Sequence, residues 1–168
     1  MLKRKLISLA LSTAMCMTFL SNAIVADTEP YLYVGNVAVT DDNADDVFKD
    51  GTVSYDTDTM VLTLNGATIK DGLKNCGLIS NIVADNLSAI ELIGENKLIG
   101  DTSICYYGIL GTMNHDVVFT GNGSLDITFE DEESATGILA KNIINGDKNS
   151  SPKVSINLEH GYPIICGG

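Results

Sequence analysis

Few residues of this 168-residue chain are of types that support catalysis. Histidine occurs twice, and only His115 has a carboxylate neighbour, Asp116, at a position that repeats along the chain. Catalysis on an acidic polysaccharide needs such a base together with cationic groups that hold the substrate. After residue 26 the chain has no arginine, and its seven lysines are scattered. The sequence therefore predicts no catalytic residues, and we expect His115 and His160 to be solvated turn residues.

Carboxylates are abundant, with 22 aspartates and glutamates. Any close pair of them could hydrolyse a neutral glycoside, but the densest run, residues 130–133, is typical of an exposed loop. Asp41, Asn43 and Asp45 resemble the start of a calcium loop, although Asp46 replaces its glycine and Thr52 its closing glutamate. We therefore predict neither a metal nor a cofactor.

Carbohydrate binding uses aromatic rings, on which sugars stack, with polar groups nearby. Tryptophan is absent and tyrosine occurs six times. Tyr106 and Tyr107 are adjacent at a predicted strand corner, where one of the two rings should face outward. Together with Tyr33 they are the predicted ligand-binding residues, and simple packing at the corner is the alternative.

The elements that position these residues repeat about every 28 positions, a period in the range of stacked-repeat proteins. Gly66, Gly94 and Gly121 each follow an alternating apolar run and are spaced by about one period. Asn86, Asn114 and Asn142 recur at the same period. Short β-type runs at a fixed period are typical of stacked repeats that share one apolar interior. We therefore predict an all-β fold, a right-handed parallel β-helix of three to four coils.

The alternating runs also predict which residues face the interior. Alternate residues of a strand point to one face, and the predicted interior residues are Leu62, Leu64, Ile69, Ile90, Leu92, Leu98, Val118, Leu125, Ile127 and Ile138. At one corner the amides of Asn86, Asn114 and Asn142 are expected to stack as a structural ladder.

The chain divides into three predicted regions. Residues 1–26 begin with Lys3, Arg4 and Lys5, continue with an apolar run and end with small residues, a pattern typical of a cleaved secretory signal. Residues 27–60 form a predicted cap, with strands at 31–34 and 36–40, a short helix at 44–49 and the first strand of a hairpin at 52–55. Residues 61–168 form the coils, which we expect to be truncated or uncapped at the C-terminus.

Charge and localisation limit the partners. The formal net charge is −12, and it becomes −15 once the three basic residues of the signal are removed. So acidic a chain repels nucleic acid and anionic lipid. We expect a secreted or cell-surface protein with no membrane insertion after signal cleavage. An open last coil also predicts end-to-end self-association.

Three cysteines remain after the signal. The spacing of Cys76 and Cys105 is close to one repeat, so a disulfide between adjacent coils is one interpretation and free buried thiols are the other. Cys166 has no partner at a matching spacing.

Several segments resemble a group of secreted proteins of Gram-positive gut bacteria that are often described as carbohydrate-binding or β-helix surface proteins. They are YVGNVAVT at 33–40, NADDVFKDGTVSYD at 43–56, LTLNGATI at 62–69, IELIGENKLI at 90–99 and TGNGSLDIT at 120–128. The resemblance implies a surface β-helix that binds glycans or serves adhesion or display without catalysis. Tyr33 stands where the group usually has tryptophan. A polysaccharide-degrading lyase or hydrolase, or a fragment of one, is the first alternative, and a structural spacer is the second.

Overall fold

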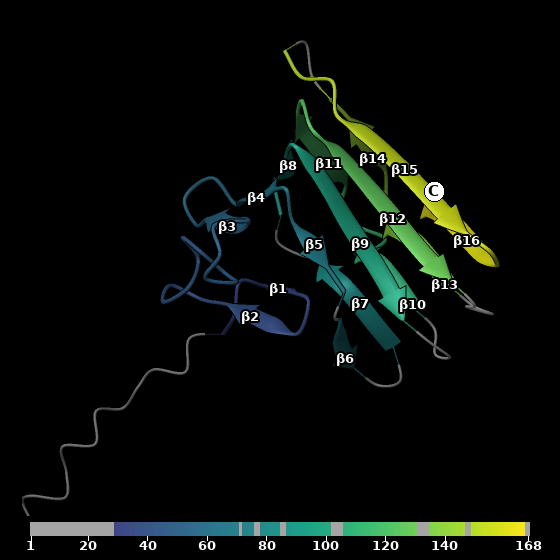
Figure 1. Cartoon of the computed structure of the whole chain (residues 1–168), viewed down its shortest axis with the longest axis horizontal. Helices are drawn as coiled ribbons and strands as arrows, with labels where there is room; N and C mark the ends of the chain where they lie inside the picture. The colour runs from purple at the N-terminus through teal and green to yellow at the C-terminus, as the bar shows by residue number, and fades with distance from the viewer. Residues whose placement is uncertain are drawn as a thin grey trace, which may run out of the picture.

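The computed structural model describes residues 29–70, 72–75, 78–84, 87–101, 106–130, 135–146 and 149–166. Within these ranges every regular element is a β-strand, and the strands form three sheets (Figure 1). The predicted signal, 1–26, lies outside the described residues, as do Cys76, Asn86 and Cys105.

The largest sheet has seven strands in the order β16-β13-β10-β7-β1-β2, with β6 also paired to β7. Its strands are β1 (Leu32–Val34), β2 (Val37–Val39), β6 (Leu73–Asn75), β7 (Leu78–Val83), β10 (Tyr106–Leu110), β13 (Ala135–Ala140) and β16 (Gly161–Cys166).

The other two sheets have five and four strands, in the orders β14-β11-β8-β4-β3 and β15-β12-β9-β5. The five-stranded sheet contains β3 (Val53–Asp56), β4 (Val61–Asn65), β8 (Ala89–Ile93), β11 (Val117–Gly121) and β14 (Ile143–Asn145). The four-stranded sheet contains β5 (Thr68–Ile69), β9 (Glu95–Asp101), β12 (Ser124–Glu130) and β15 (Lys153–Leu158).

Within each sheet, parallel neighbours are three elements apart in the chain, except that β4 pairs with β8 and β5 with β9, four elements apart. Leu62 lies opposite Ile90, and Ile90 lies opposite Phe119. Neighbouring strands of a sheet are about 4.8 Å apart. Side chains of the same row therefore follow one another at this spacing across a sheet.

The predicted fold class is wrong. A single right-handed parallel β-helix with a separate cap was expected, whereas the described residues form three separate open sheets. Two of these sheets contain antiparallel pairs, since β1 pairs with both β2 and β7, β6 pairs with β7, and β3 pairs with β4. The sequence period predicts which strands are equivalent, but it carries no information on which strands the non-repeating N-terminal strands pair with. These strands belong to the sheets instead of forming a unit of their own.

The helix predicted at 44–49 is also absent, because side chains bind the backbone groups that a helix would use. Asn43 Oδ1 accepts the N–H of Thr40 at 2.8 Å, and Asp46 Oδ1 accepts the N–H groups of Asp50 and Gly51 at 3.1 and 3.0 Å. Short polar side chains compete with helical hydrogen bonds in this way. The segment consists of turns, and Lys49 adopts a left-handed φ of 61°.

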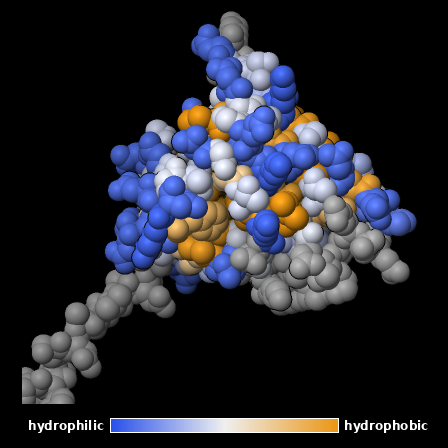
Figure 2. All heavy atoms as spheres, viewed as in Figure 1, coloured by the Kyte–Doolittle hydropathy of each residue, from blue (hydrophilic) through white to orange (hydrophobic). Residues whose placement is uncertain are grey.

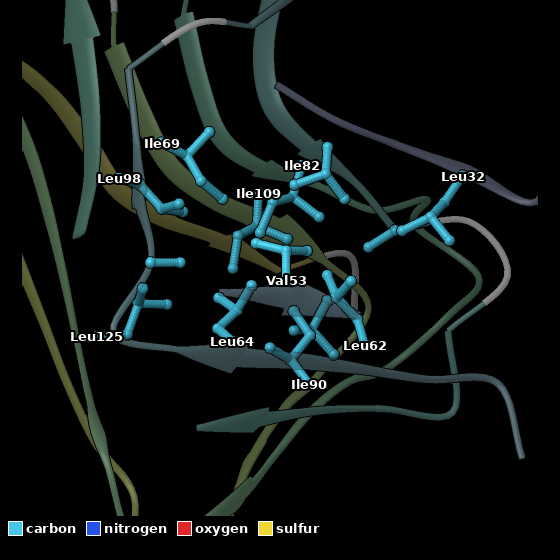
Figure 3. Packing of buried hydrophobic residues seen from close by; sticks show 14 of the residues in the cluster. Leu32, Val53, Leu62, Leu64, Ile69, Ile82, Ile90, Leu98, Ile109 and Leu125 are labelled. Atoms are coloured by element: carbon cyan, nitrogen blue, oxygen red, sulfur yellow. The ribbon is translucent and has the colours of Figure 1, made fainter. Parts of the chain in front are cut away.

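The interior lies between the three sheets, where apolar side chains from all of them meet (Figure 3). Every predicted interior residue except Val118 is buried. Val118 is half-buried because its neighbours Val117 and Phe119 take the inward positions. Burial falls towards the last strands, since Ile138 is 1% exposed and Ile164, next in the same row, is 50% exposed.

Candidate functional site

The two adjacent tyrosines of the predicted ligand site face opposite sides of their sheet. Tyr106 is 1% exposed, and its ring centroid lies 4.8 Å from that of Phe129. The Tyr106 hydroxyl accepts a hydrogen bond of 3.0 Å from Asn81 Nδ2. Tyr107, the next residue of β10, is half-buried on the outer face. Only Tyr107 of this pair can therefore meet a ligand from solution.

Tyr107 belongs to a row of four residues that we call the tyrosine row: Ser80, Tyr107, Thr136 and Tyr162. These residues are aligned across β7, β10, β13 and β16. Tyr162 is 65% exposed, whereas the short side chains of Ser80 and Thr136 are only 3% exposed. The two tyrosines are two strand spacings apart, about 10 Å.

Tyr33 lies outside this row. It pairs with Val83, which is followed in register by Leu110, Leu139 and Ile165. Along β7, two consecutive buried residues, Asn81 and Ile82, separate Ser80 from Val83. The outer face therefore carries two rows of residues, one through Ser80 and one through Val83, and buried residues lie between them. Tyr107 and Tyr33 are on different rows, so the structure does not bring them together.

The predicted amide ladder can be followed only in part, because Asn86 lies outside the described residues. Asn114 and Asn142 are both exposed, and Asn142 Nδ2 donates to Asp116 Oδ1 at 2.8 Å. The amides that join strands in the interior are those of Asn81, which reaches Tyr106, and Asn96; they are 0% and 1% exposed. A polar residue at an inward position of an alternating strand was the signal that could have identified them.

A concave site of about 430 Å³ lies at the N-terminal turns. Its lining includes the carboxylates of Asp41, Asp45, Asp56 and Asp58 and the buried ring of Tyr55. The Tyr31 hydroxyl donates to Asp41 Oδ1 at 2.6 Å, and this hydrogen bond raises the pKa of Tyr31. The lining contains no cationic side chain.

The partial calcium motif at 41–45 forms part of these turns. Besides accepting the N–H of Thr40, Asn43 donates from Nδ2 to the Ala38 carbonyl at 3.0 Å. Its amide is therefore occupied by the backbone. Among the residues that the structure describes, no group of three or more metal-ligating side chains is arranged to hold an ion.

A second groove, of about 390 Å³, lies on the four-stranded sheet and is lined by β9, β12 and β15. Glu95, Lys97, Asp126 and Lys153 line it, so its charges balance. Asp126 Oδ1 accepts hydrogen bonds of 2.8 Å from both Ser155 Oγ and Asn157 Nδ2. In the view of Figure 2 the surface is mixed, with hydrophilic residues over and between hydrophobic ones.

The remaining sequence candidates lie apart from one another. His115 Nδ1 is 2.7 Å from Thr112 Oγ1 in an exposed turn, and His160 is exposed near β16. Cys166 is a free, exposed thiol. The proposed disulfide partners and most of the acidic run 130–133 lie outside the described residues. The described part of the chain contains no helix of the length and apolarity that a membrane span requires.

Comparison with family models, with curated proteins and with solved structures found no match. The resemblance to secreted carbohydrate-binding surface proteins therefore stays an expectation. The site must be chosen on geometry alone. Of the predicted ligand residues only Tyr107 belongs to the tyrosine row, in which Tyr162 is the other tyrosine; the row lies on aligned, hydrogen-bonded strands, and we take it as the candidate site.

Proposed function

We propose that this chain is a non-catalytic carbohydrate-binding module of a secreted or cell-surface protein, used for adhesion or display. The observation that carries the proposal is the alignment of Tyr107 and Tyr162 on one outer row. A tyrosine ring offers an apolar face for the C–H groups of a sugar, and its hydroxyl hydrogen-bonds to sugar hydroxyls. Because β10, β13 and β16 are hydrogen-bonded neighbours, the backbone positions of the two tyrosines are held at a fixed spacing.

The charge of the molecule favours a neutral glycan. The formal net charge is −12, so an anionic polymer is repelled as it approaches. Carboxylates near a neutral sugar, in contrast, accept hydrogen bonds from its hydroxyl groups. Neutral polysaccharides and neutral host-type glycans are therefore the ligands to test first.

The test is binding to an array of neutral and acidic glycans, followed by titration of the best neutral ligand. Tyr162→Ala removes the more exposed ring and should weaken binding about three- to tenfold, since one aromatic contact contributes roughly 0.5–1.5 kcal/mol. Met113→Ala is the matched control, because Met113 is 50% exposed and lies outside the tyrosine row. Its affinity should equal that of the wild type.

Three results would overturn the proposal. If the folded protein bound no glycan on the array, the result would favour a structural spacer. Release of reducing ends or unsaturated products from a polysaccharide would favour the enzyme alternative. Equal affinity of wild type and Tyr162→Ala would place any binding elsewhere on the molecule.

A further inference from the structure

We infer that the tyrosine row takes a linear glycan of at least three sugar units, laid across the strands, in preference to single sugars. This inference rests on the proposed function and concerns the size and direction of the ligand. It follows from the spacing of the two tyrosines along the row, which the register sets independently of any particular sugar.

The distance between the rings is the first step. Tyr107 pairs with Thr136, and Thr136 pairs with Tyr162, so one strand separates the two tyrosines. Two strand spacings amount to about 10 Å. A hexose ring built from bonds of about 1.5 Å is about 3 Å across, and with its linking oxygens one unit of a linear glycan spans roughly 5 Å. One sugar therefore covers one tyrosine, and a ligand that reaches both rings needs a further unit between them.

The residue between the tyrosines permits this arrangement. Thr136 has a short side chain and is only 3% exposed, so it lies below the surface that the neighbouring side chains form and does not project between the two rings. A middle sugar can pass above it while its neighbours stack on Tyr107 and Tyr162. The ligand then runs perpendicular to the strands, because the row itself crosses β10, β13 and β16.

The energetic consequence is that affinity increases sharply once the ligand is long enough to contact both tyrosines; we call this increase the step. Once one unit has bound to one ring, the second contact is intramolecular and profits from an effective concentration in the millimolar range. Shorter ligands gain nothing from the second ring. Affinity per ligand should therefore rise about three- to tenfold between two and three or four units, as one aromatic contact is gained, and then level off.

The experiment titrates purified oligosaccharides of one to six units, prepared from the glycan that binds best, into wild type, Tyr162→Ala and Met113→Ala. Wild type and Met113→Ala should show the step. Tyr162→Ala should retain weak binding that hardly changes with length. Because Tyr162 is 65% exposed, this variant should fold, and its thermal melting curve checks that it does.

The outcomes separate this inference from the proposed function. Wild-type affinity that is independent of length from one unit to six would overturn the inference and leave glycan binding intact. A step that survives in Tyr162→Ala would also overturn it, since a different pair of contacts would then be responsible. Failure of every glycan to bind would overturn the proposed function itself.

Discussion

Asn96 accepts a hydrogen bond of 2.8 Å from the backbone N–H of Ala67, which precedes β5. The same side chain donates from Nδ2 to the carbonyl of Ser124 in β12 at 3.1 Å and to that of Ile93 at 3.2 Å. Since Asn96 lies in β9, one buried amide joins three neighbouring segments of the four-stranded sheet. The amide is the hydrogen-bond partner of the Ala67 N–H, whereas the Ile93 carbonyl also accepts the N–H of Gly66 at 3.0 Å.

Replacing Asn96 by alanine should therefore destabilise the fold markedly. Each buried polar group left without a partner costs about 1–3 kcal/mol, so the free energy of unfolding should fall by roughly 2–4 kcal/mol. Urea denaturation of wild type and Asn96→Ala measures the change. Asn142→Ala, which removes an exposed amide with one hydrogen bond to Asp116, should cost less than about 1 kcal/mol. Equal losses in the two variants would contradict this role of Asn96.

Gly137 shows how closely neighbouring strands approach. A Cβ atom added there would lie 2.5 Å from both Ile156 Cγ2 and the Pro163 carbonyl oxygen. The carbonyl cannot move without disturbing β16, so Gly137→Ala should lower stability by about 3 kcal/mol.

Gly66→Ala is the matched control for Gly137→Ala. Gly66 has a φ of +67°, but nothing lies within 4 Å of its added Cβ, so only conformational strain of about 1 kcal/mol is expected. Thermal melting compares the two variants. Coincident melting curves would show that the strands at Gly137 have room for a methyl group.

The interior was predictable where apolar and polar residues alternate strictly, as at Leu62 and Leu64, because a strand sends alternate side chains to one face. It was not predictable at Val118, which sits between two other apolar residues. With three consecutive apolar residues, the alternation does not show whether the middle residue or the two outer ones face inward. The pairing of Phe119 with Ile90 in the neighbouring strand decides which of them face inward.

The prediction of the fold class was wrong for a related reason. Residues repeated at a fixed period predict which strands align, but the pairing of the N-terminal strands depends on tertiary contacts that no local pattern records. The candidate site shows the same limit. The chain segment from Tyr107 to Thr136 is longer than the one from Thr136 to Tyr162, so only the observed register reveals that the three share a row.

The decline in burial along one interior row gives a further prediction. Ile138 and Ile164 are aligned on β13 and β16, and they are 1% and 50% exposed. Ile138→Ala should cost about 2–5 kcal/mol through lost burial and the cavity left behind. Ile164→Ala should cost less than half as much, because its side chain already meets solvent. Denaturant titration compares them, and a larger loss at Ile164 would mean that a partner covers this edge in solution.

The N-terminal turns should be sensitive to acid. Asp56 Oδ1 accepts the N–H groups of Asp58 and Thr59, each at 2.9 Å, and the hydrogen bond from Thr59 is the main cause that lowers the pKa of Asp56. A carboxyl whose pKa is lower in the folded than in the unfolded state stabilises the fold above the unfolded value. This contribution is lost as pH falls through the folded value.

Asp56→Asn should therefore be less stable than wild type at pH 7, and the difference should shrink as pH falls below the ordinary aspartate pKa of about 4 towards the lower pKa of Asp56 in the folded protein. Asp42→Asn removes the same charge from an exposed turn residue and corrects for the change in net charge. Denaturant midpoints of the three proteins between pH 7 and pH 3 provide the measurement. A difference between Asp56→Asn and Asp42→Asn that persists unchanged at pH 3 would show that the charge on Asp56 contributes nothing to the turn, because protonation would then leave the stability of the wild type unaltered.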